Sequence, residues 1–204
     1  MFRYISFHLV IGLTCLMLAS CAAIKEKTTT EPIAWPEHQQ QRQKIKVWEI
    51  RGRLGVQTQT TGGSVDIIWK QSDQDYSIRL ILPLSVGSYL IQGNDRYAEI
   101  RYPNGRKKIV SNIDNVFTSM LGRTLPVNAI RDWVRGLPAR SLSVEKMEWD
   151  EQGLLSSIDQ SGWSVEMADY SGNDLLLPHT LYIRRSDDDE LDIRLLLRQW
   201  LVDG

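Results

Sequence analysis

From residue 48 onward, apolar and polar side chains alternate along most of the chain. In residues 48–56, Trp48, Ile50, Leu54 and Val56 fall on one face, and a period of two is typical of a strand with one buried face. Turn residues such as Gly62-Gly63 and Pro103-Asn104-Gly105 separate the next such segments, which are residues 64–70, 76–82, 88–92, 97–102 and 106–110. This regular spacing predicts a meander of antiparallel strands.

The middle of the chain changes period. Residues 112–121 and 127–134 have helical spacing, and Pro126 suits the start of the second helix. A short exposed helix is also expected at residues 36–46, and strands return at residues 143–149, 154–159, 163–168, 180–185 and 191–200. This order predicts a mainly β fold with some α: an incomplete antiparallel β-barrel of about 11 strands, covered by short helices and enclosing an apolar cavity.

The first residues have a different pattern, a basic residue followed by an apolar run. Arg3 precedes the run Ile5–Leu18, which ends in Leu18-Ala19-Ser20-Cys21. The run is shorter than the roughly 20 apolar residues that span a bilayer, and it closes on small residues, as a cleaved signal peptide does. The ending matches a lipobox, so we expect a signal peptide at 1–20, lipid on Cys21, a polar tether over 21–35 and a single domain over 36–204.

Composition limits the function further. Removing residues 1–20 from the 204 leaves 184, enough for one domain with a sizeable core, which we expect to be a monomer. The removed part holds one cation, so 23 Lys and Arg remain against 25 Asp and Glu, without the basic excess of a nucleic-acid-binding protein. Cys15 leaves with the signal and Cys21 is acylated, so no thiol remains for a disulfide, a metal or a nucleophile.

Catalytic motifs are missing from the sequence. It contains no Gly-x-Ser-x-Gly elbow, His-Glu-x-x-His or Gly-x-x-x-x-Gly-Lys segment. The processed chain keeps only His38 and His179, which have no metal-ligand spacing. We therefore expect no catalytic residues, no metal and no cofactor apart from the covalent lipid and a transient acyl-chain ligand. The protein is not expected to be an enzyme, and an anchored hydrolase is the weakest alternative.

Two apolar features call for an explanation. Large side chains on the strand faces and on the second middle helix either form an ordinary core or line a cavity, and the residues selected for such a cavity are Trp69, Leu80, Leu82, Trp133, Trp149 and Trp163. The second feature is the link Leu82–Gly87, which carries Leu84 and Val86 between two strands. An apolar residue at a loop tip either folds under the sheet or contacts an apolar partner.

Several segments resemble one family. They are Arg51-Gly52-Arg53-Leu54-Gly55-Val56, Trp69-Lys70-Gln71, Pro83-Leu84, Leu125-Pro126-Val127 and, most specific, Trp133-Val134-Arg135-Gly136-Leu137-Pro138. Over nearly the whole mature chain, the sequence resembles the LolB family of outer-membrane lipoproteins of Gram-negative bacteria. The usual Pro-Leu-Gly of the family appears here as Pro83-Leu84-Ser85, with Gly87 two places later.

The resemblance implies a function. Members of the family accept lipoproteins from the periplasmic carrier LolA in an acyl-chain cavity and place them in the outer membrane. By resemblance, the expected membrane-insertion loop is Pro83, Leu84, Ser85 and Val86, with Leu84 at its tip. Ala22 after the cysteine implies sorting to the periplasmic face of the outer membrane. The expected partners are a LolA-like carrier, lipoprotein cargo and outer-membrane lipid; the alternative is a lipid-anchored structural or assembly lipoprotein with a filled β-core.

Overall fold

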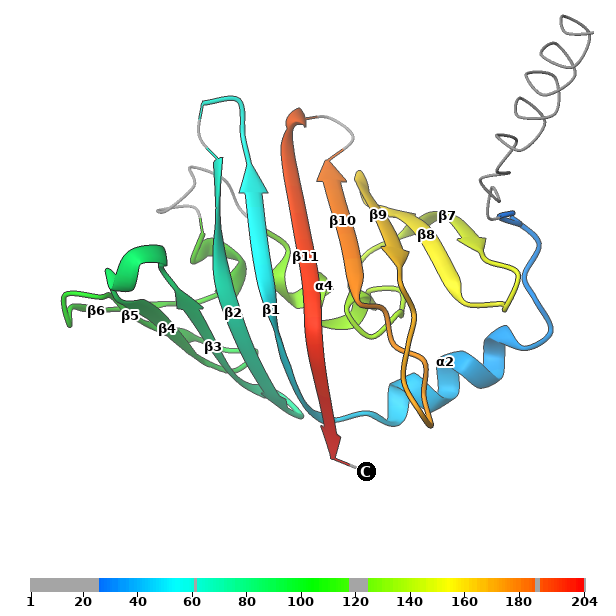
Figure 1. Ribbon diagram of the computed structural model, residues 1–204, viewed down its shortest axis with the longest axis horizontal. Coiled ribbons are helices and arrows are strands. Elements are labelled where there is room, and N and C mark those ends of the chain that lie inside the picture. The colour runs from blue at the N-terminus through cyan, green and yellow to red at the C-terminus, as the bar shows by residue number, and fades with distance from the viewer. Residues whose placement is uncertain (1–25, 61, 118–124, 186–187, 204) are drawn as a thin grey trace, which may run out of the picture.

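The computed structural model describes residues 26–60, 62–117, 125–185 and 188–203. Within these ranges the chain forms one antiparallel sheet of eleven strands (Figure 1). The first six strands are β1 (Val47–Gln57), β2 (Gly62–Ser72), β3 (Asp75–Ile81), β4 (Ser88–Gly93), β5 (Ala98–Arg101) and β6 (Lys107–Val110). The last five are β7 (Val144–Trp149), β8 (Leu155–Gln160), β9 (Trp163–Ala168), β10 (Thr180–Arg185) and β11 (Asp188–Asp203). The predicted mainly β fold is confirmed.

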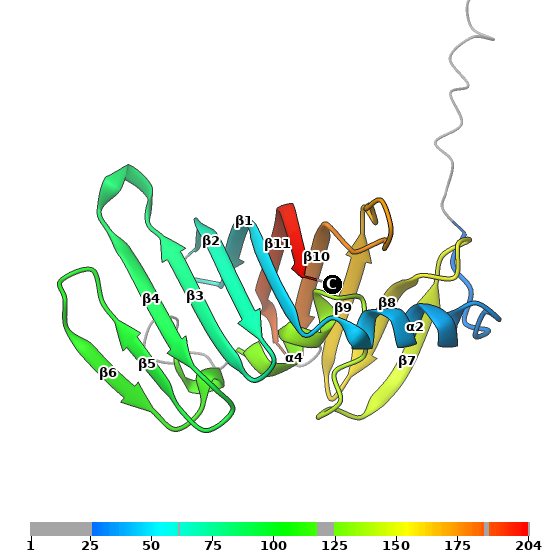
Figure 2. The same ribbon diagram turned by 90° about the horizontal axis from the view of Figure 1, so that it is seen from below.

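The strand order explains why the barrel stays open. It runs β6-β5-β4-β3-β2-β1-β11-β10-β9-β8-β7, so each half of the chain is a meander, and the first strand joins the last. The two edge strands, β6 and β7, do not pair with each other. The sheet is curved instead of closed, and Figure 2 shows its two halves bent around a concave side.

The central pair β1–β11 contains a β-bulge. Its register shifts between Arg51 and Gly52, whose partners are Gln199 and Leu197. A Cβ added to Gly52 would clash with the carbonyl oxygen of Leu196, so only glycine permits this close approach of the two backbones. The segment Arg51-Gly52-Arg53 therefore has a structural purpose, since a bulge bends a strand and helps the sheet curve.

The buried face of the sheet follows from the period of two. Successive strand pairs align Ile50, Trp69, Ile78, Ile91 and Ile100 in one row across β1 to β5. Each of these side chains is at most 3% exposed. Burying a large apolar side chain contributes about 1.5–3 kcal/mol, so this row fixes which face of the sheet turns inward.

Two α-helices and two 3-10 turns complete the described fold. Helix α4 (Val127–Trp133) lies on the concave side, and α2 (Trp35–Lys44) precedes β1 and runs past one end of the second half of the sheet (Figure 2). The helix predicted at 112–121 is instead the 3-10 turn η3 (Ile113–Asn115) where it is described, and residues 118–121 lie outside the described ranges. Asn112 caps η3 by accepting from the backbone N–H of Asp114 at 2.9 Å, which favours a tight turn.

The predicted signal peptide and Cys21 lie outside the described residues. The predicted tether is partly described, and there its backbone contacts the sheet. Thr28 and Trp149 exchange two backbone hydrogen bonds, each 2.9 Å long, and Trp35 is buried. Among the helices of the described part, none has the length and apolar character needed to cross a membrane.

Candidate functional site

An apolar pocket of about 330 Å³ lies at the end of the sheet where β1 meets β2 and β3 leads to β4. A volume of this size falls within the range of small-molecule pockets, about 300–1,000 Å³. None of the described side chains that line it carries a charge. They are Leu54, Val56, Thr58, Ser64, Val65, Leu80, Leu82, Pro83, Tyr89 and Phe117, with Gly62 and Gly63.

The alternation of the strands positions this lining. Leu54 pairs with Val65 across β1 and β2, and Leu80 pairs with Tyr89 across β3 and β4. All four side chains are on the inward face, but Val65 and Tyr89 are only partly buried. The inward face is therefore not completely filled here, and the resulting surface suits an apolar ligand.

The link between β3 and β4 adjoins the pocket. The backbone N–H of Leu82 donates to the carbonyl oxygen of Gly87 at 3.0 Å, closing a loop around the 3-10 turn η2 (Pro83–Ser85). Leu82 and Pro83 line the pocket, whereas the next residue, Leu84, is 94% exposed. Val86 is 66% exposed. The loop thus joins the pocket wall to an exposed apolar tip.

Leu84 also has a strained backbone. Its φ of 58° lies in the left-handed region, which costs an L-residue other than glycine roughly 1–2 kcal/mol. The loop keeps this conformation although the side chain gains no burial from it. Backbone strain of this kind is typical of sites where function determines the residue.

The residues predicted to line a cavity fall into two groups. Leu80 and Leu82 line the apolar pocket. The four tryptophans do not; each is at most 4% exposed, and each packs against another indole ring in the core, with ring centroids 5.4–6.5 Å apart. These four are Trp69, Trp133, Trp149 and Trp163.

Sequence reasoning missed several residues of the pocket. Leu54 and Val56 share the alternating face of the first predicted strand, and Val65 has the matching position on the second, so the period of two could have indicated all three. Tyr89 alternates with Ile91 in the predicted strand 88–92, so the same period could have indicated it as well. Phe117 carried no comparable signal, because it follows a 3-10 turn that the sequence pattern suggested was a helix.

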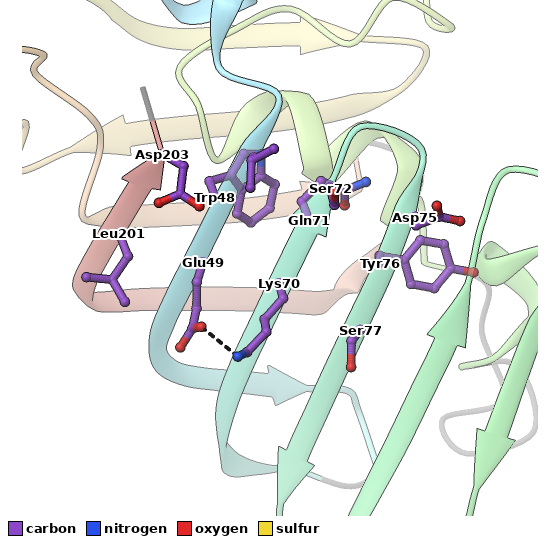
Figure 3. Close-up of a pocket in the computed structure, with 11 residues that line it drawn as sticks. Trp48, Glu49, Lys70, Gln71, Ser72, Asp75, Tyr76, Ser77, Leu201 and Asp203 are labelled. Carbon is purple, nitrogen blue, oxygen red and sulfur yellow. Dashed lines mark ion pairs between the residues drawn. The ribbon is translucent and has the colours of Figure 1, made fainter.

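A second hollow, of about 460 Å³, lies at the opposite end of the sheet (Figure 3). Charged side chains surround it: Glu49 pairs with Lys70 at 3.1 Å, and Asp75 and Asp203 lie nearby. The hydrogen bond from Arg51 lowers the pKa of the Glu49 carboxyl group, as does a hydrogen bond from Lys70, so the group is ionised at neutral pH. An acyl chain would have to displace water from these charges, so the hollow is the poorer site for an apolar ligand.

The two histidines within the described ranges are hydrogen-bonded to backbone. Nδ1 of His38 lies 3.3 Å from the carbonyl oxygen of Gly153, and Nδ1 of His179 lies 2.7 Å from that of Leu197. Within the described ranges, no three His, Cys, Asp or Glu residues come together as a metal site. The candidate site that the described residues offer is the apolar pocket beside the Leu84 loop.

Comparisons with known proteins agree with this geometry. The family model of the outer membrane lipoprotein LolB matches residues 46–200. The outer-membrane lipoprotein LolB of Pseudomonas fluorescens is 30% identical over 199 residues, covering 95% of each chain. The LolB of Alkalilimnicola ehrlichii is 29% identical, covering 94% of this chain and 95% of that protein.

Solved structures share the fold at low sequence identity. A LolA superfamily protein from Nitrosomonas europaea superposes with a TM-score of 0.56 at 6% identity, covering 85% of this chain and 95% of that chain. A putative outer membrane lipoprotein-sorting protein domain from Vibrio parahaemolyticus gives a TM-score of 0.50 at 8% identity, covering 82% and 92%. Because the family model spans most of the sequence, the chain belongs to the family of the outer-membrane lipoprotein LolB, which serves lipoprotein localisation at the outer membrane.

Proposed function

We propose that this protein accepts lipoproteins from a LolA-like periplasmic carrier and inserts their acyl chains into the outer membrane without ATP. One observation carries the proposal: the wall of the apolar pocket continues through Leu82 and Pro83 into a loop whose next residue, Leu84, is 94% exposed. A site that shelters acyl chains and an apolar group that can enter a bilayer are thus consecutive in the chain.

The pocket supplies the first part of the mechanism. Acyl chains are poorly soluble in water, so they move at low cost only between apolar environments. A receiving pocket that binds them more tightly than the carrier draws them across without nucleotide hydrolysis. The bilayer is a still better solvent for the chains, so release also proceeds downhill.

Leu84 supplies the contact with lipid. Burying one leucine side chain contributes roughly 1.5–3 kcal/mol, which supports a transient contact and not a permanent anchor. The permanent anchor in this proposal is the lipid on Cys21, whose acyl chains contribute about 0.8 kcal/mol for each buried CH₂. The protein therefore stays at the membrane while its loop enters and leaves the lipid surface.

The test is transfer of an acylated lipoprotein from a purified LolA-like carrier to a soluble form of this protein that begins at residue 22. All described strands, helices and core residues are retained in this form. We expect cargo to move without ATP and then to enter vesicles. Failure of a folded protein to take up cargo would contradict the proposal and favour a structural lipoprotein with a filled core.

A substitution in the loop separates uptake from delivery. Leu84→Glu places a charge at an exposed position, so the fold and the pocket should be unaffected. We expect this variant to accept cargo at the wild-type rate and to lose delivery to vesicles. If uptake fell as much as delivery, the loop would not be an insertion device.

A further inference from the structure

A basic hairpin lies next to the exposed loop. The β5–β6 hairpin carries four cations within eight residues: Arg101 at the end of β5, Arg106 in the turn, and Lys107 and Lys108 at the start of β6. No acidic residue occurs from residue 100 to residue 113. All four side chains are exposed. The hairpin is tightly closed, because the backbone N–H of Tyr102 donates to the carbonyl oxygen of Arg106 at 2.9 Å.

Two of the four cations have no acidic partner in the described part of the chain. Glu99 pairs with Lys107 at 3.0 Å and with Arg101 at 3.6 Å. Arg106 and Lys108 form no ion pair with any residue that the structure describes. The chain as a whole has a formal charge of −1, so this positive patch is a local feature and not a consequence of the overall composition.

The hairpin and the loop are in direct contact. A Cβ added to Gly87, whose φ is +125°, would lie 2.9 Å from the Cβ of Pro103 in the hairpin turn. The rings of Tyr89 and Tyr102 also pack edge to face, with centroids 5.6 Å apart. Both views of the ribbon place η2 and the β5–β6 turn at the same end of the sheet (Figures 1 and 2).

We propose that the β5–β6 hairpin binds anionic phospholipid headgroups while Leu84 enters the bilayer beside it. Exposed apolar side chains flanked by cations are the usual composition of a surface that lies at a membrane interface, where the apolar groups enter the acyl region and the cations stay among headgroup phosphates. An acidic protein partner would account for Arg106 and Lys108, but it would leave the apolar Leu84 and Val86 beside them without a partner.

The inference rests on the proposed function, because it takes the end of the sheet that carries Leu84 to be the delivering end. The inference adds a preference for anionic over neutral lipid headgroups, which the apolar tip alone cannot provide. Leu84 partitions into any bilayer, whereas a cation distinguishes anionic from neutral headgroups. The preference should weaken in salt, since charges separated by more than about 8 Å are screened at 0.15 M ionic strength.

The test measures co-sedimentation of the soluble form beginning at residue 22 with vesicles of phosphatidylcholine, alone or mixed with phosphatidylglycerol. We expect wild-type protein to prefer the mixed vesicles, and R106Q/K108Q to lose binding to them on the order of tenfold at low salt. Binding of this variant to neutral vesicles should not change. The matched control K44Q/K46Q removes two exposed cations at the far end of the sheet and should bind as wild type does.

Two results would overturn the inference: equal binding of wild type to both vesicle types, or equal binding of wild type and R106Q/K108Q to mixed vesicles. In the second case, reduced cargo uptake from the carrier would show that the cations serve a protein partner. Transfer of cargo is scored separately. Cargo that moves without a lipid preference upholds the proposed function alone, and a lipid preference without cargo transfer upholds the headgroup contact alone.

Discussion

The indole Nε1 of Trp133 donates a hydrogen bond of 2.8 Å to Oε1 of Gln160, and both side chains are completely buried. The same Oε1 accepts from the backbone N–H of Ala139 at 2.9 Å, while Nε2 donates to the carbonyl oxygens of Ala139 and Leu142. One amide group on β8 therefore holds the segment that follows α4 against the sheet. Gln160 therefore binds the first residue of the Trp133–Pro138 sequence motif, Trp133, and the residue that follows the motif, Ala139.

Gln160→Leu should destabilise the protein by about 3 kcal/mol, because it leaves the Trp133 indole N–H and the Ala139 backbone N–H buried without an acceptor, each at a cost of roughly 1–3 kcal/mol. Urea denaturation followed by tryptophan fluorescence measures the change in the free energy of unfolding. The control Gln92→Leu alters an exposed glutamine and should shift the value by less than about 0.5 kcal/mol. Equal effects of the two variants would contradict the role given to Gln160.

Leu84→Asn should increase the free energy of unfolding by up to about 1 kcal/mol, because asparagine tolerates the left-handed conformation better than leucine. The same variant should lose delivery of cargo to vesicles. Denaturation and the transfer assay measure the two effects. Val86→Asn is the matched control: Val86 is also exposed but has a φ of −64°, so it should bring no gain in stability. A loss of stability in Leu84→Asn would mean that the leucine side chain stabilises the loop.

The sequence predicted most of the sheet but less of the site, and the reason is physical. A period of two shows which residues share a face, so the inward positions of Trp69, Leu80 and Leu82 could be inferred. It does not show how far a side chain lies from the end of the sheet that holds the apolar pocket. The indoles of Trp133 and Trp163 pack together in the core, while smaller Leu54 and Val56 leave room for the pocket.

Sequence patterns also could not predict contacts between residues that are far apart in the chain. Alternation cannot show that Pro103 of one hairpin touches Gly87 of another, or that Gln160 bonds Trp133 across 27 positions. The exposed tip was only partly visible in the sequence. Pro83 and Gly87 marked a turn with Leu84 between them, but the pattern left open whether Leu84 folds under the sheet or faces outward. Only the family resemblance placed Leu84 at the tip, where it is exposed.

Val56→Trp should fill the apolar pocket, because Val56 lies on its wall and is only partly buried. We expect uptake of acylated cargo to fall at least tenfold. The free energy of unfolding should fall by no more than about 3 kcal/mol, because overpacking a core site usually costs about 1–3 kcal/mol and this site has room. The transfer assay with the carrier measures uptake. The control Val144→Trp adds the same ring at an exposed position on edge strand β7 and should leave uptake unchanged. Full uptake by Val56→Trp would show that cargo binds elsewhere.

Stability should fall as the pH rises from 10 to 12. Burial, with a smaller contribution from the charge of Asp95, raises the pKa of Tyr76 from 10.0 to about 12. A raised pKa means that the folded state holds the phenol proton more tightly, so this contribution is complete below pH 10 and is lost as the pH passes through 12. Denaturation at pH 9 and pH 11.5 should show a smaller pH dependence for Tyr76→Phe than for wild type. Tyr97→Phe, at a half-exposed position, should retain the wild-type dependence.

The backbone bridge between Thr28 and Trp149 limits how far the domain can reach from its anchor. Only six residues separate Cys21 from Thr28, so a fully extended chain spans at most about 25 Å between them. Thr28→Pro removes the N–H that donates to Trp149 and should lengthen the free segment. We expect the amide of Trp149, which donates to Thr28, to lose protection from hydrogen exchange in this variant. Thr29→Pro changes a neighbouring N–H that makes no hydrogen bond within the described part, and should leave that protection in place. If both variants kept Trp149 protected, its amide would be shielded by burial alone, and the bridge would not set the reach of the domain.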